Sequence, residues 1–242
     1  MRILVISDIH ANLTALQTVL TAADPIDAAW CLGDVVGYGP DPNECIQIIR
    51  TLPNLKCILG NHDAAVIEML DTQSFNREAR QAIEWTQTIL EPEGIAFLKD
   101  LPESRAMGQV TLVHGSPRHP VWEYLLDVYT ATHSFASFDT DYCFVGHTHL
   151  PAVFQLVSEG QIAKLFVPEP DKKITLTPRL IINPGSVGQP RDRDPRAAYA
   201  IFTPEESTWE YHRVLYDVSS VQARMRAAGL PDKHIQRISN GW

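Results

Sequence analysis

The chain opens with Met1-Arg2-Ile3-Leu4-Val5-Ile6-Ser7-Asp8-Ile9-His10, an apolar run that ends directly in a polar cluster. A short run of branched apolar residues that stops at a polar turn predicts a buried β-strand over residues 3–6. Asn12 then stands where it can cap a helix, whose inner face would be Leu13, Leu16, Val19 and Leu20. A strand followed by a helix is half of a βαβ unit, so this stretch predicts an α/β fold.

The same alternation of strand-like and helix-like runs continues through the first two thirds of the chain. Further strands are predicted over residues 28–32, 57–59, 110–113, 143–145 and 180–182, with a helix after Asn43. Later strands are predicted over residues 153–157, 162–167, 198–202 and 209–214, with a helix over residues 218–228. This second group of strands indicates a second sheet packed on the first.

The whole chain, residues 1–242, is predicted to form a single domain, because this length is common for one α/β domain and no linker or repeat interrupts it. One stretch departs from this alternation of predicted strands and helices. Residues 76–101 have the pattern of two amphipathic helices, yet they separate two predicted strands by more than a usual crossover. Two interpretations are open: a helical cap inserted over the site, or helices that cover one face of the sheet.

Composition and charge argue against several classes of protein. A net charge of -9 disfavours a protein that holds a nucleic-acid backbone, which needs clustered Lys and Arg. The first apolar run is too short for a signal peptide, and no run of about 18 apolar residues could span a membrane, so a cytoplasmic protein is expected. The cysteines form no CxxC pair and are expected to be reduced core residues: Cys31, Cys45, Cys57 and Cys143.

Five polar clusters each directly follow a predicted strand. They are Asp8-Ile9-His10, Gly33-Asp34, Gly60-Asn61-His62-Asp63, His114-Gly115 and Gly146-His147-Thr148-His149. Residues just past the carboxyl ends of parallel strands converge on one crevice of an open α/β sheet, so we expect these side chains to meet. Each cluster alone is weak evidence, because Gly-Asp is usually a turn and a lone His is often a core residue. Five such clusters together indicate one functional site.

The residue types in these clusters suit metal ions. Carboxylates supply charge, imidazoles supply nitrogen donors, an amide oxygen completes a shell, and no thiolate is needed. Two dications about 3.5–4 Å apart repel each other, so a shared ligand helps to hold them, and Asp34 fits that bridging role. His147 and His149, two apart in an extended segment, could serve adjacent metals. The remaining histidines are expected to be structural or surface residues: His119, His133, His212 and His234.

The order of the five clusters resembles the pattern of the calcineurin-like metallophosphoesterase superfamily, with motifs D-x-H, G-D, G-N-H-D/E, an isolated H and G-H-x-H between Arg2 and Phe202. The resemblance implies a two-sheet α/β sandwich with helices on the outer faces and a dinuclear site at the strand ends. It implies these ligands: Asp8, His10 and His149 for one metal, Asn61, His114 and His147 for the other, and Asp34 between them. His62 would lie beside the metals and donate to the phosphate or leaving group, while Asp63 could orient its imidazole or raise its basicity.

Two segments resemble the small bacterial and archaeal phosphodiesterase branch of the superfamily: residues 33–40 (GDVVGYGP) and 183–191 (NPGSVGQPR). Ser/Thr phosphatases and typical symmetrical dinucleoside tetraphosphate hydrolases carry a phosphate-binding Arg where this chain has Gly37 and Tyr38. Substrate selection would then use other groups. The candidates are Arg118, Arg191 and Arg193 for phosphate, and Trp122 or Tyr124 for stacking on a base or aryl group. Each arginine could equally be an exposed loop residue, and core packing is the alternative for the aromatic pair.

These features predict a metal-dependent hydrolase of phosphate esters, first of all a phosphodiesterase with a metal-bound hydroxide as nucleophile. Two divalent metal ions are the expected cofactors, with Mn first and Fe, Zn, Ni or Mg as alternatives, and the expected partner is a small phosphorylated substrate. A phosphomonoesterase or a dinucleoside polyphosphate hydrolase is the alternative among enzymes. A non-catalytic metal-binding interaction scaffold is the alternative of another class. The sequence leaves the physiological substrate and the oligomeric state open, a homo-oligomer included.

Overall fold

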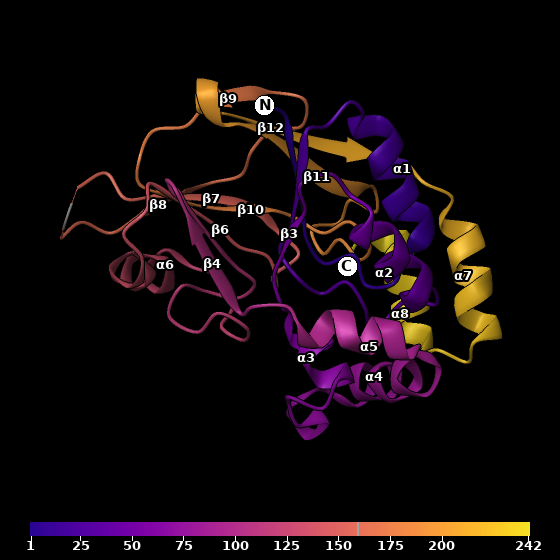
Figure 1. The fold of residues 1–242 in the computed structure, drawn as a ribbon. Coiled ribbons are helices and arrows are strands. Elements are labelled where there is room, and N and C mark those ends of the chain that lie inside the picture. Colours follow the sequence, from indigo (N-terminus) through magenta and orange to yellow (C-terminus); the bar gives the residue numbers. More distant parts are fainter. Residues whose placement is uncertain (159) are drawn as a thin grey trace.

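The computed structural model describes residues 1–158 and 160–242 and contains two mixed sheets of six strands each, flanked by helices (Figure 1). The first sheet, in spatial order, consists of β3 (Lys56–Cys57), β2 (Ala28–Cys31), β1 (Ile3–Ile6), β11 (Ala197–Thr203), β12 (Thr208–Val214) and β9 (Lys173–Thr175). The second consists of β4 (Ser104–Met107), β5 (Val110–Val113), β6 (Tyr142–Phe144), β10 (Leu180–Pro184), β7 (Pro151–Gln155) and β8 (Lys164–Phe166). The predicted two-sheet α/β sandwich with helices on the outer faces is confirmed.

The two sheets pack face to face because alternate residues of each strand point to opposite sides. On β1, Ile3 and Val5 enter the apolar layer between the sheets, whereas Leu4 and Ile6 point outward to the helices. Trp30 of β2 meets the ring of Phe144 of β6 across this layer, with ring centroids 5.6 Å apart. The result is a stack of four layers, with helices outside both sheets.

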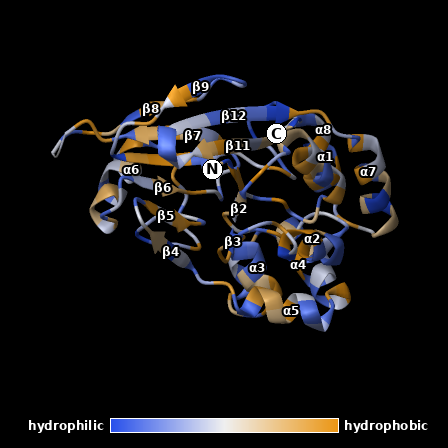
Figure 2. Cartoon of the chain, turned by 45° about the horizontal axis from the view of Figure 1, so that its top comes forward, coloured by the Kyte–Doolittle hydropathy of each residue, from blue (hydrophilic) through white to orange (hydrophobic). Residues whose placement is uncertain are grey.

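Most helices bury their apolar faces on the outer side of the first sheet. These helices are α1 (Leu13–Ala23), α2 (Pro42–Arg50), α4 (Arg77–Ile89), α5 (Pro92–Lys99), α7 (Val218–Ala227) and α8 (Asp232–Asn240). Helix α3 (Asn61–Val66) follows β3, and α6 (Val128–Ser134) covers the second sheet. Short 3-10 turns lie at Thr72–Ser74, Phe135–Ser137 and Pro204–Glu206. Figure 2 shows hydrophilic and apolar residues side by side on the peripheral helices, as amphipathic packing requires.

Residues 76–101 form the two expected helices, α4 and α5. Their apolar residues Ala82, Ile83 and Leu98 belong to the same core as the outer side of the first sheet. Helix α4 packs on α3, and α5 packs on α2. Among the described residues near this segment, Phe75, just before α4, contacts the ring of His62, with centroids 5.1 Å apart. The two helices thus pack on the core outside the first sheet, and the residue just before them reaches the ring of His62.

All four cysteines are buried and free, as the sequence predicted. Cys31 and Cys57 lie side by side on the parallel strands β2 and β3. Across the described parts of the chain, no helix combines the length and the apolar content that a membrane span requires.

Candidate metal centre

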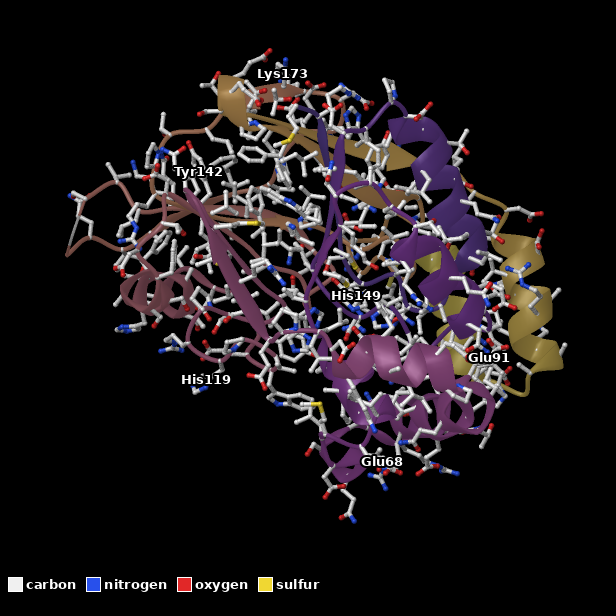
Figure 3. The ribbon with its side chains drawn as sticks, in the orientation of Figure 1. Glu68, Glu91, His119, Tyr142, His149 and Lys173 are labelled. Carbon is white, nitrogen blue, oxygen red and sulfur yellow. The ribbon has the colours of Figure 1, made fainter. Side chains whose placement is uncertain are left out.

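The five polar clusters meet because both sheets end at the same place. Strand β1 pairs in parallel with β2, and β2 with β3, so Asp8, Asp34 and Asn61 leave the first sheet at one edge. Strands β5 and β6 are also parallel, and His114 and His147 follow them in the second sheet. In Figure 3, His149 lies in the interior where the strand ends approach the helices, whereas His119 lies at the periphery.

Several of these residues hold left-handed backbone conformations, which are uncommon outside glycine and concentrate at functional sites. They are Asp8 (φ 53°), His10 (48°), Asp34 (54°), His147 (64°) and His149 (61°). Main-chain hydrogen bonds between the loops hold these turns; the His10 N–H donates to the Asp34 carbonyl at 2.9 Å. Gly60 is needed here, because a Cβ at this position would lie 2.1 Å from Asp34 Oδ1.

One group of potential ligand atoms is formed by Asp8, His10, Asp34 and His149, all buried. His149 Nε2 lies 3.3 Å from Asp8 Oδ1 and 3.1 Å from His10 Nε2. His10 Nε2 lies 3.6 Å from Asp34 Oδ2. Two carboxylates and two imidazoles therefore face a common point.

A second group is formed by Asp34, His114 and His147, whose ligand atoms all lie within 4.8 Å of one another. His114 Nε2 lies 3.3 Å from Asp34 Oδ2 and 3.0 Å from Asn61 Oδ1. Asp34 is the residue that the two groups share. The sequence-predicted ligands are thus brought together in the two sets that the family resemblance implies, with Asp34 between them.

The tautomers of the histidines follow from their hydrogen bonds to backbone carbonyls. A carbonyl oxygen only accepts, so the ring nitrogen that faces it carries the proton and the other nitrogen carries a free lone pair. The pairs are His10 Nδ1 to Val36 O (3.1 Å), His114 Nδ1 to Leu32 O (2.7 Å), His149 Nδ1 to Gln189 O (2.6 Å) and His147 Nε2 to Trp122 O (3.0 Å). In the neutral form of each ring, the nitrogen that faces the cluster is then the one that carries the lone pair.

The buried cluster consequently presents acceptors to acceptors. The free lone pairs of His10 and His149 face each other at 3.1 Å, and Nε2 of His114 lies 3.0 Å from the Asn61 side-chain oxygen. Asp8 Oδ1 and Asp34 Oδ2 are buried and have no hydrogen-bond partner. Such groups are costly to bury unless a cation lies among them. The carboxylate, imidazole and amide donor set fits divalent metal ions.

The pKa values of several candidate ligands favour the protonation states that bind metal. Burial lowers the pKa values of His10, His147 and His149 well below the usual range, which keeps these rings in the neutral form that binds metal. Burial also opposes ionisation of Asp34, but the charge of His114 and its neighbours outweighs it and holds the Asp34 pKa well below its usual range. Burial lowers the pKa of His114, yet Asp34 raises it overall to about 9. Metal binding at His114 would therefore release a proton.

His62 lies beside the cluster. Its ring is buried against those of His10 and Tyr38, with centroids 4.9 and 4.3 Å apart, and its Nδ1 has no hydrogen-bond partner. Its backbone N–H donates to Asp34 Oδ1 at 2.8 Å. The carboxylate of Asp63 accepts from the N–H groups of Val36 and Gly60 at 3.0 and 3.1 Å. Asp63 is therefore engaged by the backbone of the turn rather than by the His62 ring that it was expected to orient.

The candidate substrate residues divide into two sets. The ring of Tyr124 stacks on His147 with centroids 3.8 Å apart, and Arg191 lies over the ring of Tyr38 beside His10. Arg118 and Arg193 are exposed and engaged elsewhere: Arg118 pairs with Glu123, and Arg193 stacks on the ring of Trp242. The structure therefore brings Tyr124 and Arg191 to the centre and leaves Arg118 and Arg193 away from it.

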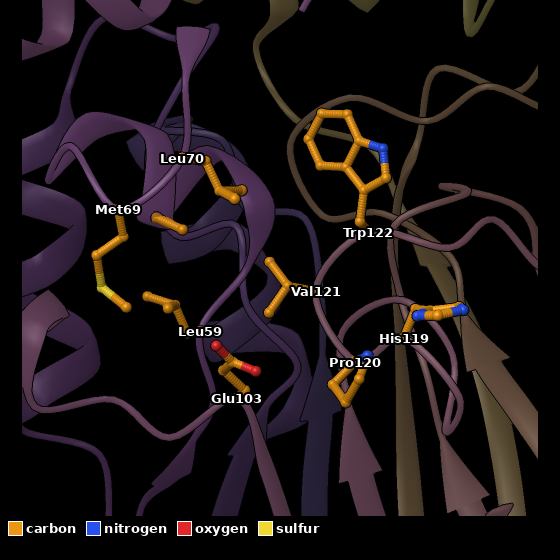
Figure 4. A pocket seen from close by; sticks show the side chains of 9 residues that line it. Leu59, Met69, Leu70, Glu103, His119, Pro120, Val121 and Trp122 are labelled. Atoms are coloured by element: carbon orange, nitrogen blue, oxygen red, sulfur yellow. The ribbon is translucent and has the colours of Figure 1, made fainter. Parts of the chain in front are cut away.

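Trp122 connects the centre to a pocket of about 240 Å³ (Figure 4). Its carbonyl accepts from His147, while its ring meets Phe75, with centroids 5.0 Å apart. The pocket is mainly apolar and is lined by Leu59, Ala64, Met69, Leu70, Glu103, His119, Pro120, Val121 and Trp122. A flat aromatic group of a substrate could enter between these side chains.

Sequence reasoning missed the neighbours of Tyr38. The Tyr38 ring is buried 4.5 Å from the ring of His10, and on its other side His234 of α8 lies 4.4 Å away. His234 was expected to be structural or at the surface, and it is a buried residue. Nothing in the sequence links residues this far apart; the unusual Tyr in the second motif was the one available signal.

Comparisons with known proteins agree with this architecture. A family model described as a calcineurin-like phosphoesterase superfamily domain matches residues 1–207. An uncharacterized protein of Methanocaldococcus jannaschii is 40% identical over 99% of this chain and 98% of its own length. The crystal structure of a metallophosphoesterase from Sphaerobacter thermophilus is 46% identical and covers 100% of this chain and 99% of its own, with a TM-score of 0.92. A symmetrical bis(5'-nucleosyl)-tetraphosphatase of Baumannia cicadellinicola is 47% identical over 62 residues, which are 24% of this chain and 22% of that protein.

Proposed function

Because the chain belongs to the calcineurin-like phosphoesterase superfamily, we propose that it is a metal-dependent phosphoesterase that acts first of all on phosphodiesters. The observation that carries the proposal is the pair of buried acceptor groups that share Asp34. One oxygen of this buried carboxylate, Asp34 Oδ2, has no hydrogen-bond partner and lies between the two sets of imidazoles, an arrangement suited to a ligand that two cations share.

In this proposal the chain holds two divalent ions. One ion would be held by Asp8, His10 and His149, the other by Asn61, His114 and His147, and Asp34 would bridge them. When bound, the ions supply positive charge for phosphate oxygens and lower the pKa of a coordinated water. Manganese is the first candidate, with iron, zinc, nickel or magnesium as alternatives.

The protein's own groups then position the ester. The ring of His62 lies beside that of His10 but is not one of the proposed metal ligands. Its ring N–H would therefore donate to the phosphate or to the leaving oxygen. Asp63 would act through the backbone, by holding the Gly60 turn that presents Asn61 and His62. The rings of Trp122 and Tyr124, which adjoin His147, would hold a base or aryl group of the substrate.

A phosphomonoesterase or a dinucleoside polyphosphate hydrolase is the alternative, and the short similarity to the Baumannia tetraphosphatase supports the second of these. A non-catalytic metal-binding scaffold is the alternative of another class. It is disfavoured because every ligand position and His62 are filled by suitable residues.

The test is hydrolysis of bis-p-nitrophenyl phosphate by protein loaded with Mn²⁺, before and after a chelator, with p-nitrophenyl phosphate as the monoester comparison. We expect metal-dependent cleavage of the diester, abolished by the chelator and by His114→Ala. His133→Ala is the matched control, because His133 is exposed on α6. Protein that binds two ions and cleaves no ester would favour the scaffold, and preference for the monoester would favour a phosphomonoesterase.

A further inference from the structure

The pocket of about 240 Å³ beside the metal centre shares the residue Trp122 with it (Figure 4). The ring of Trp122 lies 6.3 Å from that of His147, centroid to centroid, and its carbonyl accepts from His147 Nε2 at 3.0 Å. The same ring lies 5.0 Å from that of Phe75, which in turn lies 5.1 Å from the ring of His62. One wall of the pocket therefore connects to a proposed metal ligand and to His62.

The opposite wall of the pocket continues from the Gly60-Asn61-His62 turn. Leu59 directly precedes this turn, and Ala64 lies in α3, which begins within it. Figure 4 shows Leu59 and Met69 across the pocket from Trp122. Met69 and Trp122 are 56% and 40% exposed, although both are large apolar residues. Apolar surface left open beside a centre of this kind indicates a place for a ligand.

The size and the lining of the pocket suit one flat ring system rather than a phosphate. Pockets for drug-sized ligands span about 300–1,000 Å³, so a volume of about 240 Å³ suits a smaller group. Among the described residues that line the pocket, none is Lys or Arg, so no cation there would bind a phosphate. The indole face of Trp122 and the thioether of Met69 are instead suited to contact with an aromatic ring.

The polar groups of the pocket lie away from the ring of Trp122. Figure 4 shows Glu103 and His119 at the end of the pocket opposite the Trp122 ring, with the Glu103 carboxylate directed toward Leu59 and Val121. Glu103 is exposed on the loop that precedes β4. A carboxylate has two oxygens that accept hydrogen bonds and none that donates. A ring that reaches this end should therefore present N–H donors, and two adjacent donors would use both oxygens.

Guanine is the common base that meets this requirement. Its N1–H and its 2-amino group are adjacent, so both can donate to one carboxylate. In adenine and cytosine the amino group adjoins a ring nitrogen that accepts, and in uracil the N3–H lies between two carbonyls, so a carboxylate would face an acceptor in each case. The two guanine donors also lie on the edge remote from the ribose. A nucleotide whose phosphate lies at the metal centre would extend this edge furthest along the pocket.

We propose that this pocket binds a guanine base of the substrate, with Trp122 against the face of the base and Glu103 as the residue that selects guanine. The inference rests on the proposed phosphoesterase function and narrows its substrate class to esters of guanine nucleotides. The phosphate would lie at the metal centre, and the base would extend past Trp122 to Glu103.

Two substrates that differ by a single amino group test this assignment. They are the methyl phosphodiesters of guanosine 5'-phosphate and of inosine 5'-phosphate, whose base lacks only the 2-amino group of guanine. Chromatography of the products gives kcat/KM whichever ester bond is cleaved. We expect a preference of about 5- to 50-fold for the guanosine ester, as for a hydrogen bond to an exposed carboxylate. Glu103→Gln should bring the two esters within about twofold of each other, because an amide offers one acceptor and turns a donor toward the base.

Glu93→Gln is the control, since Glu93 is exposed on α5 and its replacement changes the net charge equally. This variant should keep the wild-type ratio between the guanosine and inosine esters. Equal values of kcat/KM for the two esters with wild-type protein would overturn the proposal. So would a preference for the guanosine ester that Glu103→Gln leaves undiminished.

Calorimetric titration of guanosine 5'-phosphate and inosine 5'-phosphate into Mn²⁺-loaded protein separates the base pocket from the phosphoesterase function. We expect guanosine 5'-phosphate to bind at least about fivefold more tightly, and Glu103→Gln to remove the difference. If neither ester is cleaved but this difference in binding depends on Glu103, the guanine pocket stands and the proposed function fails. If both esters are cleaved at equal rates and the two nucleotides bind equally, the guanine pocket is refuted and the function stands.

Discussion

Replacing His62 by alanine separates metal binding from action on the phosphate. The ring of His62 lies beside the proposed ligands, with its centroid 4.9 Å from that of His10, and its Nδ1 has no partner to lose. The contact that supports Asp34 is made by the backbone N–H of residue 62, at 2.8 Å, and alanine retains it. We therefore expect His62→Ala to keep both metal ions at wild-type occupancy.

The rate should nevertheless fall, because a donor to the phosphate or leaving oxygen is removed. Loss of a positioned proton donor slows a reaction by about 10²–10⁴-fold, and loss of one donor to developing charge by about 10²–10³-fold. These ranges overlap, so the size of the loss does not tell the two roles apart. How the loss of rate depends on the leaving group distinguishes the two roles. A leaving oxygen that departs readily as an anion needs little protonation, so its ester loses little if His62 is a proton donor.

The assay is hydrolysis of a series of methyl aryl and methyl alkyl phosphodiesters, with metal content measured on the same samples. If His62 delivers a proton, alkyl esters lose most, nitrophenyl esters lose least, and the plot of log rate against leaving-group pKa becomes steeper. A uniform loss would instead assign His62 to charge stabilisation. His133→Ala, an exposed histidine of α6, serves as the control and should leave all rates within about twofold of wild type. Loss of metal from His62→Ala would refute the reasoning and place His62 among the ligands.

Two further substitutions test the turn at the centre and the packing of the fold. Gly60→Ala would place a Cβ 2.1 Å from Asp34 Oδ1, so we expect displacement of this carboxylate and at least about tenfold weaker metal binding in a calorimetric titration. Unchanged metal affinity would contradict the close approach. Phe144→Ala removes a ring packed between the sheets against Trp30 and Trp209, with centroids 5.6 and 5.2 Å apart, and should lower the free energy of unfolding by about 3–5 kcal/mol in urea titrations. A loss below about 1 kcal/mol would contradict face-to-face packing of the sheets.

The parts of the fold that the sequence predicted are those with a strong local pattern. Strand β1 is a continuous apolar run, and Asn12 caps α1 by accepting from the Ala15 N–H at 3.1 Å, as its position indicated. The helix predicted over residues 218–228 appears as α7, one residue shorter. Each of these elements is determined by neighbours in sequence, which is why its pattern can be read without the structure.

Other elements lacked such a pattern. Strand β4, Ser104–Met107, lies mostly exposed at the edge of the second sheet and shows no apolar alternation. Strand β3 ends at Cys57, whereas the apolar run predicted a strand through residue 59. At Leu59 the chain already turns toward the centre, and its N–H donates to the carbonyl of Pro102 at 2.9 Å. Such boundaries depend on tertiary contacts that a local pattern does not contain.

The residues of the candidate site likewise include some that the sequence could predict and some that it could not. Its metal-facing residues were predictable because each follows a strand, and strand ends converge in this class of fold. The sequence could not predict which arginine lies at the site, because Arg118, Arg191 and Arg193 occupy similar loops and differ only in their tertiary partners. Arg191 meets Tyr38, 153 positions away in sequence, whereas Arg118 meets the nearby Glu123. The contact of His234 with Tyr38 could not be predicted for the same reason, since it depends on how α8 packs.

The central claim is that Asp34 joins two metal ions in one site, and metal content measures this most directly. Wild-type protein and Asp34→Asn would be loaded with Mn²⁺, freed of unbound metal and analysed for metal per chain. Asp34 Oδ2 faces His10 at 3.6 Å and His114 at 3.3 Å, so the loss of its charge should weaken both positions. We predict two ions per chain in the wild type, and loss of both, together with activity, in the variant. Two tightly held ions in Asp34→Asn, or a single ion in the wild type, would contradict the shared site.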